Sequence, residues 1–197
     1  MIAVFNTGSR LVRKLFVIVW LGIAISAQSQ DVRVEKSVFG VQTGFLGIWG
    51  HGEFRISNKF ALRIEAGLDG SFWDGTMFEK TGFVLEPVIT IEPRWYYNLA
   101  EREHKSKSVR RNSGNFISVK CSFQPDWFVI SNDDYVNRSR DIVIIPTWGI
   151  RRNMGKHFNY EAGFGVGYQY IFDSQTGGPE NEGSVAYNVL LRAGFNF

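Results

Sequence analysis

The sequence predicts an all-β protein: a closed antiparallel up-and-down transmembrane β-barrel of about eight strands. Long segments alternate apolar and polar residues with a period of two, which is typical of strands with two different faces. These segments exceed the usual globular strand of about 5 to 6 residues. They approach the roughly 9 to 11 residues with which a tilted strand crosses a bilayer. After the first thirty residues there is no apolar run long enough for a membrane helix.

Residues 1–29 read as a signal peptide, which is set aside from the fold. A basic segment with Arg10, Arg13 and Lys14 precedes an apolar run over residues 15–27, and a small-x-small cleavage site ends at Ser29. The alternative is a membrane anchor, but this apolar run is shorter than the roughly 20 residues of a spanning helix. We therefore expect residues 30–197 to form one exported barrel domain.

The net positive charge of the chain comes from this predicted signal peptide. It holds three of the 22 Lys and Arg residues and none of the 19 Asp and Glu residues, so the remainder is balanced. A basic isoelectric point of this origin does not indicate a nucleic-acid partner. Cys121 is the single cysteine, which excludes an intrachain disulfide or a thiolate metal cluster. No cofactor is predicted.

The predicted strands follow one another in a regular series. The last one places Val185, Tyr187, Val189 and the alternate residues up to Phe197 on one wholly apolar face. The segment before it alternates aromatics with Gly and polar residues in the same way. In chain order the eight strands are predicted at residues 38–49, 53–57, 62–68, 84–97, 117–123, 142–151, 158–170 and 185–197, with the first connection at residues 50–52. The even number suits antiparallel closure.

The connections predict an orientation if both chain ends lie on the periplasmic side. Residues 58–59 and 152–157 are then short periplasmic turns, whereas residues 70–82, 124–141 and 173–183 are longer outer loops. The long, basic periplasmic link at residues 98–114 fits this scheme less well. Pro87, Pro93 and Pro146 interrupt predicted strands, and we expect bulges or local breaks there. Aromatics at the strand ends suit interfacial girdles, namely Trp49, Trp95, Tyr96, Tyr97, Trp127, Trp148, Tyr168 and Tyr170.

The polar faces carry acids and bases in near balance. The acids are Glu53, Glu65, Glu86, Glu92 and Glu161, and the bases are Arg55, Arg63, Arg94, Lys120, Arg151 and Arg192. Because a lone buried charge is costly, these side chains predict an interior network of ion pairs. The network is assigned to Arg63, Glu65, Glu86, Glu92, Arg94, Lys120, Arg151, Glu161 and Arg192. Eight strands enclose room for side chains but not for a diffusion pore.

The search for catalytic residues leaves two alternatives open. The histidines at 51, 104 and 157 lie in predicted connections, and the outer rim is expected to carry His51, Asp69, Ser71, Asp74, Asp126, Asp133 and Asp134. Their spacing marks no catalytic group, although an enzyme acting on lipid or peptide at this rim stays open. The other alternative is a soluble exported barrel that binds an apolar ligand in its lumen.

The end of the chain carries a resemblance to a known family. The terminal Gly194, Phe195 and Phe197, a glycine followed by alternating aromatics, look like the C-terminal assembly signal of outer-membrane proteins. The chain resembles small barrels of the OmpA and OmpX type. The stretches EPRWYYNL at residues 92–99 and SGNF at 113–116 resemble a group of uncharacterised barrels from Bacteroidetes-like, Gram-negative bacteria. The resemblance implies an outer-membrane location, with membrane lipids and the assembly machinery as partners, and brings no catalytic residues.

Overall fold

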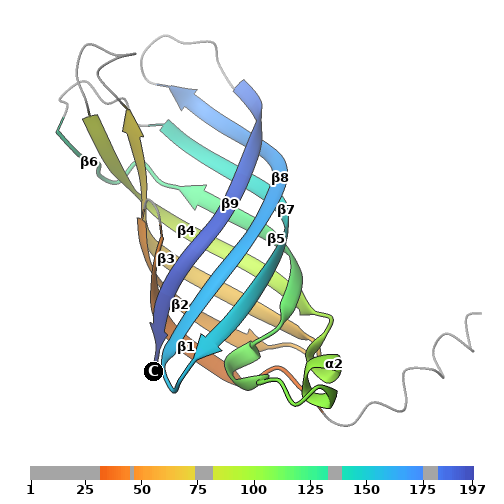
Figure 1. The fold of residues 1–197 in the computed structure, drawn as a ribbon. Coiled ribbons are helices and arrows are strands. Elements are labelled where there is room, and N and C mark those ends of the chain that lie inside the picture. The colour runs from red at the N-terminus through yellow and green to blue at the C-terminus, as the bar shows by residue number, and fades with distance from the viewer. Residues whose placement is uncertain (1–31, 45–46, 74–81, 133–138, 175–181) are drawn as a thin grey trace, which may run out of the picture. The chain divides into compact units, whose positions relative to one another are not determined.

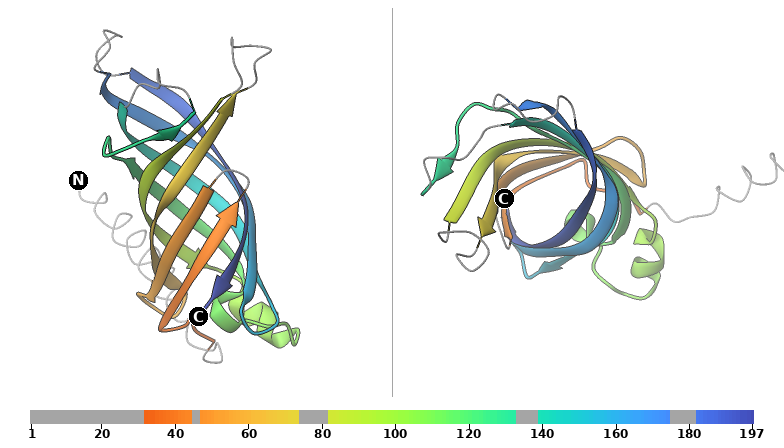
Figure 2. Two further views of the ribbon diagram at one scale, coloured as in Figure 1. Left: turned by 90° about the vertical axis from the view of Figure 1, so that its left-hand side faces the viewer. Right: turned by 90° about the horizontal axis from the view of Figure 1, so that it is seen from above.

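The chain folds into a closed antiparallel β-barrel, as the alternation predicts. The computed structural model describes residues 32–44, 47–73, 82–132, 139–174 and 182–197. The predicted signal peptide at residues 1–29 lies outside these residues. Arg33–Phe197 form one compact unit. Figures 1 and 2 show its strands inclined to the axis of a ring, with the C-terminus at the lower end in Figure 1.

Eight long strands form the ring in chain order, and each pairs with its neighbours in an up-and-down arrangement. The ring closes because β1 pairs with β9 and β3 pairs with β4. A two-residue strand, β6 (Ile130–Ser131), extends the free edge of β4 at the upper end. The long strands are β1 (Ser37–Gly44), β2 (Gly47–Arg55), β3 (Phe60–Trp73), β4 (Gly82–Tyr96), β5 (Asn115–Gln124), β7 (Ser139–Met154), β8 (Phe158–Ser174) and β9 (Glu182–Asn196).

The period-two pattern sends apolar side chains outward and polar ones into the lumen. On β9, Tyr187 and Val189 are exposed at 75% and 76%, whereas the lumen-facing Arg192 is buried. On β3, Arg63 and Glu65 are buried, whereas Ile64 between them is exposed. The charged side chains are therefore the ones that leave solvent, which is the reverse of a soluble β-sandwich.

The first hairpin differs from the predicted one. Its turn lies between Gly44 and Gly47, which are register partners, and not at residues 50–52. Strand β2 runs straight through residues 50–52, and His51 continues the lumen-facing row of Trp49 and Glu53. Gly47 explains the shift, because its φ of +155° lies in the region that favours glycine at a turn.

The two ends of the barrel differ in their connections. At the lower end of Figure 1 lie the short turns at residues 56–59 and 155–157, together with both ends of the barrel domain. The long link predicted at residues 98–114 also lies there, and it contains α2 (Leu99–His104) and the 3-10 turn η2 (Arg110–Asn112). Within the described ranges, no helix combines the length and the apolar character that spanning a bilayer would need.

The three strand prolines produce local breaks and not bulges. Pairing of β4 with β5 skips Glu92 and Pro93 and resumes at Arg94 in unchanged register. Pairing of β7 with β8 skips Pro146 in the same way. Pro87 lies on β4 beyond the last residue that pairs with β5. Each proline therefore lies where its missing N–H breaks no ladder bond on that side.

A row of glycines on β8 lies close to the backbone of β7. A Cβ atom on Gly163, Gly165 or Gly167 would lie within about 2.4 Å of a carbonyl oxygen of β7, where no side chain fits. These three glycines are thus required by the close approach of the two backbones.

Gly167→Ala tests this requirement. The added methyl group would lie 2.0 Å from the Ile144 carbonyl oxygen, and overpacking of this kind costs about 1 to 3 kcal/mol. The control is Gly50→Ala, whose methyl group meets nothing nearer than 3.8 Å. Urea unfolding of the two variants in detergent should show a loss of stability for Gly167→Ala alone. Equal midpoints would contradict the close-approach argument.

Candidate functional site

The strand register builds two charged rows on opposite walls of the lumen. On the first wall Glu53, Arg63 and Glu92 are successive register partners on β2, β3 and β4. On the second wall Arg151, Glu161 and Arg192 are successive partners on β7, β8 and β9. The first row reads negative, positive, negative and the second reads positive, negative, positive, so the two rows are complementary where they face each other.

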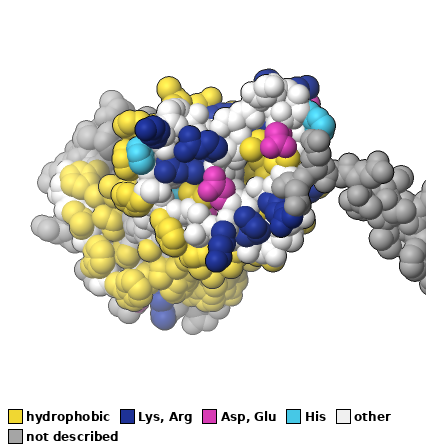
Figure 3. Space-filling model, turned by 90° about the horizontal axis from the view of Figure 1, so that it is seen from below, with side chains coloured by type: hydrophobic (Ala, Val, Ile, Leu, Met, Phe, Trp, Pro, Cys, Tyr) yellow, Lys and Arg dark blue, Asp and Glu magenta, His cyan; other side chains and the backbone are white. Residues whose placement is uncertain are grey.

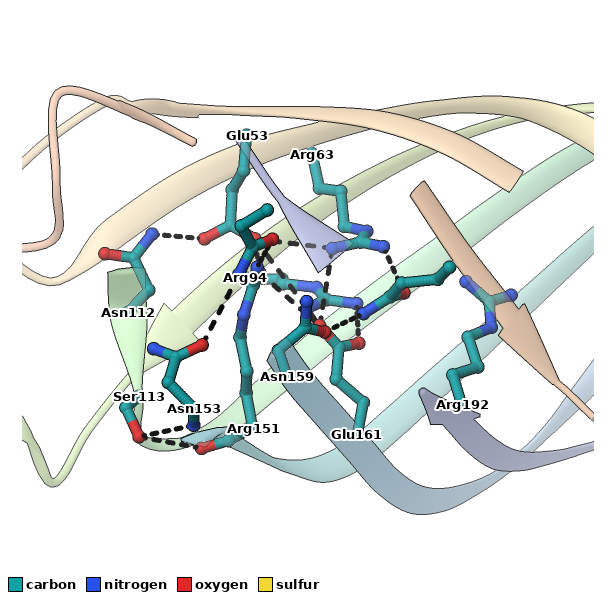
Figure 4. Close-up of polar contacts among 12 residues, drawn as sticks. Glu53, Arg63, Arg94, Asn112, Ser113, Arg151, Asn153, Asn159, Glu161 and Arg192 are labelled. Carbon is teal, nitrogen blue, oxygen red and sulfur yellow. Dashed lines mark hydrogen bonds and ion pairs between the residues drawn. The ribbon is translucent and has the colours of Figure 1, made fainter. Parts of the chain in front are cut away.

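Glu161 and Glu53 connect these rows across the lumen (Figure 4). Glu161 lies 3.1 Å from an Arg94 nitrogen and 3.4 Å from nitrogens of both Arg63 and Arg151. Glu53 accepts a hydrogen bond of 2.9 Å from Arg151. All five side chains are essentially inaccessible to solvent. Several guanidinium groups around each carboxylate satisfy charges that would otherwise be costly to bury.

Two more carboxylates complete a balanced set of four Glu and four Arg, which we call the ion plug. Glu65 accepts hydrogen bonds from Arg63 and, at 2.9 Å, from Arg192. Glu92 accepts from Arg94 at 2.8 Å and from Ser118 of β5 at 2.6 Å. Gln42 of β1 bridges Arg63 and Asn159 with hydrogen bonds of 2.7 Å. Every long strand therefore contributes a side chain to the ion plug or to its hydrogen bonds.

The long link closes the lower end of the lumen below the ion plug. Asn112 of η2 is buried, donates to Glu53 and accepts a hydrogen bond of 2.6 Å from the Glu35 amide. Its φ of +60° is one that Asn tolerates better than most residues. The buried ring of Tyr96 packs against Phe116, its hydroxyl donates to Glu53 at 3.3 Å, and Arg94 stacks over Phe116 at 4.2 Å. Figure 3 shows Lys and Arg side chains gathered on this end of the barrel.

Above the ion plug the lumen widens into a cavity of about 760 Å³, which we call the upper cavity. It is partly open to solvent, and its lining includes Trp49, Asp69, Glu86, Lys120 and Asp141. Trp49 donates a hydrogen bond of 2.5 Å to Asp69, and Arg192 stacks on the Trp49 ring at 3.9 Å. The lumen is thus sealed at one end and hollow at the other.

The structure separates the nine charges that the sequence assigned to a single network. Two of them, Glu86 and Lys120, line the upper cavity and form no ion pair among the described residues. Glu53, which the assignment left out, joins the ion plug. Arg55 lies on the exposed lower end, where it donates to the Val34 carbonyl oxygen at 2.6 Å. The seven charges that do meet in the ion plug are Arg63, Glu65, Glu92, Arg94, Arg151, Glu161 and Arg192.

The expected position of His51 at the outer rim is wrong. His51 lies inside the lumen at 5% exposure, and neither ring nitrogen has a hydrogen-bond partner among the described residues. Its place on β2 follows from the shifted first turn. Asp69 and Ser71 line the upper cavity, and Asp126 is an exposed residue 3.5 Å from Arg140. Asp74, Asp133 and Asp134 lie outside the described residues.

Two aromatics assigned to the interfacial girdles also face the lumen. Trp49 and Tyr96 are buried, because they belong to the same period-two rows as Glu53 and Arg94. Trp95, Tyr97, Trp127, Trp148 and Tyr168 are exposed on the outside and Tyr170 is half-buried, and their role as a girdle stays a prediction.

The terminal residues hold the seam between the first and last strands. Gly194 and Phe195 pair with Gln42 and Val41 of β1, and the Phe197 amide donates to the Phe39 carbonyl oxygen at 3.0 Å. Arg111 of the link donates to the Phe197 carbonyl oxygen at 3.2 Å. The role of Gly194, Phe195 and Phe197 as an assembly signal stays a prediction.

Sequence reasoning missed the uncharged members of the site. Gln42, Asn112, Ser118 and Asn159 complete hydrogen bonds of the ion plug. Gln42, Ser118 and Asn159 share the faces that alternation sends inward, so that pattern could have identified them. Asn112 lies in an irregular link, where no periodic signal exists.

The described residues contain no group of three or more His, Cys, Asp or Glu side chains arranged to hold a metal ion.

Comparisons of the chain with protein-family models, with curated proteins and with solved structures find no match.

Replacing Glu161 should destabilise the barrel. Glu161→Gln removes the carboxylate that three buried guanidinium groups share, and breaking a buried ion pair costs about 3 to 5 kcal/mol. The control Glu103→Gln makes the same chemical change on the exposed face of α2, where the effect stays within about 0.5 kcal/mol. Urea unfolding measures both. A Glu161→Gln barrel as stable as the control would show that the ion plug is not needed for stability.

Proposed function

We propose that the chain is an integral outer-membrane β-barrel with a structural or surface-interaction role and with no wide pore. One observation carries the proposal: the barrel has its polarity inverted. Arg63 on β3 and Arg151 on β7 are completely buried, whereas large apolar side chains on the same two strands, Ile64 and Trp148, are exposed. In water this arrangement would be unfavourable, because apolar surface would stay hydrated while charges were dehydrated.

A bilayer removes the cost of the hydrated apolar surface, and the ion pairs of the lumen offset the cost of the buried charges. Exposed apolar side chains occur on every long strand and include Phe39, Ile48, Ile64, Ile91 and Ile117 on the first five strands and Ile144, Phe164 and Val189 on the last three. A soluble monomer rarely exposes an apolar surface of this extent. The closed ring also leaves no free sheet edge around its middle, which is the condition for strands to lie in hydrocarbon.

The soluble ligand-binding alternative requires the opposite arrangement of faces. A lumen that binds an apolar ligand would be lined mostly by apolar side chains. Here the middle of the lumen is filled by four Glu and four Arg side chains, and the upper cavity is lined by Asp69, Glu86, Lys120 and Asp141. The lumen chemistry therefore favours the membrane proposal over this alternative.

The orientation follows from the two unlike ends. We place the lower end, which carries both ends of the domain, the short turns and α2, in the periplasm, and the end with the longer connections outside. Basic residues of the link, among them Lys107 and Arg110, then lie near anionic lipid headgroups. The terminal Phe195 and Phe197 would serve recognition by the assembly machinery, as the OmpA and OmpX resemblance implies.

Accessibility of single cysteines tests the membrane proposal. In a Cys121→Ser background, Val189→Cys and Leu191→Cys should react with a lipid-confined thiol probe, because both positions face outward. The control Leu190→Cys lies between them and faces the lumen, where that probe should not reach. Reaction at position 190 alone would mean that the barrel is inverted relative to this proposal.

Fractionation of the expressed chain provides an independent test. We expect it in the outer-membrane fraction, with different gel mobilities before and after boiling, because a closed barrel resists unfolding by detergent. Recovery in the soluble periplasmic fraction would overturn the proposal.

The ion plug predicts that the barrel does not conduct ions. Purified protein in planar bilayers should give no stable current steps, because the ion plug and the buried Asn112 fill the lower lumen. Steady ohmic conductance would contradict the sealed lumen.

A further inference from the structure

The upper cavity differs from the ion plug in its charge balance. In the ion plug, four carboxylates meet four guanidinium groups. In the upper cavity, the three carboxylates of Asp69, Glu86 and Asp141 face a single unpaired ammonium group, that of Lys120, since Arg192 is already paired with Glu65. Two negative charges therefore stay without a protein counter-charge in the described part of this cavity.

The carboxylates also lie where their negative charges repel one another. Asp69 and Glu86 are register partners on β3 and β4, where like charges directly opposite each other repel. Asp141 comes from β7, and its carboxylate accepts a hydrogen bond from Gln169. Trp49 holds Asp69 in the same way. Two of the three groups are thus fixed in place by donors that leave their charge uncancelled.

Glu86 is the carboxylate of the upper cavity that has no partner among the described residues. It makes no hydrogen bond and no ion pair within the described residues, although it is half-buried. Lys120, on the neighbouring strand β5, is likewise without an ion pair or hydrogen bond. Partly buried charges without partners, in a cavity with walls of low dielectric constant, attract a mobile ion of opposite charge.

We propose that the upper cavity binds a compact organic dication, of which a short linear diamine is the simplest member. The charge of such a ligand matches the two uncompensated carboxylates, and a volume of about 760 Å³ is within the range of small-molecule sites. Ser71, Ser122 and Gln124 also line the cavity, and their side-chain oxygens are of the kind that can accept hydrogen bonds from ammonium groups. The sealed lower lumen makes this a binding site and not a passage.

This inference uses the closed barrel, and it rests on the proposed function for one point, that the cavity faces the cell exterior. The test is calorimetric titration of the whole barrel in detergent micelles with 1,4-diaminobutane, 1-butylamine and 1,4-butanediol. The diamine should bind at least about tenfold more tightly than the monoamine, because it adds a second charge pair. The diol should give no binding heat.

Three variants locate the site. Glu86→Gln should weaken diamine binding about tenfold, and Lys120→Gln should strengthen it about threefold to tenfold by removing a repelling charge. Glu103→Gln, the matched change on exposed α2, should leave the affinity unchanged. Glu86 makes no hydrogen bond with a described residue, so the Glu86→Gln variant should fold. The gain expected for Lys120→Gln is a separate test that does not require the Glu86 variant.

The outcomes separate this inference from the membrane proposal. No diamine binding by wild-type barrel that shows the folded gel mobility would overturn the inference and leave the membrane proposal intact. Equal affinities for the diamine and the monoamine, or an unchanged affinity in both cavity variants, would also overturn it. Diamine binding by a barrel that fails the lipid-labelling test would support the cavity and overturn the membrane proposal.

Discussion

The cross-lumen attraction between two complementary charged rows is the interaction on which the rest of this barrel depends. Each row is a product of register: β2, β3 and β4 align Glu53, Arg63 and Glu92, and β7, β8 and β9 align Arg151, Glu161 and Arg192. A one-residue slip would carry a row to the outside, because successive side chains point to opposite faces. The ion plug thus ties the strand alignment to the energetic cost of an unpaired charge.

The packing of the wall serves this interior. Glycines on β8 let its backbone approach β7 closely, and the prolines lie where strand pairing is interrupted without a change of register. The link between β4 and β5 adds Asn112 to the ion plug, so an irregular segment completes what the strands leave unsatisfied. Side chains therefore fill the lower half of the lumen, whereas the upper half keeps a cavity in which the described carboxylates outnumber the described cations.

The sequence predicted most of the charged residues that face inward but not how deep in the lumen they lie. The two-residue alternation of apolar and polar residues can be read directly from the sequence. The all-β barrel fold predicted from it is confirmed. Depth depends on strand stagger and on where the first turn falls, which is why Glu86 and Lys120 were assigned to the ion plug and His51 to the rim. Asn112 was not predicted because it lies in an irregular link, where the sequence shows no alternation of apolar and polar residues.

The ion plug also bears on how such a chain reaches its folded state. In the ion plug, the strands from β2 to β4 contribute three acids and two bases, and those from β7 to β9 contribute one acid and two bases. Neither group is neutral alone, and the imbalance of one is the opposite of the other. A half-formed sheet would therefore hold uncompensated charge, so closure of β9 on β1 should be an all-or-none event without a stable open intermediate.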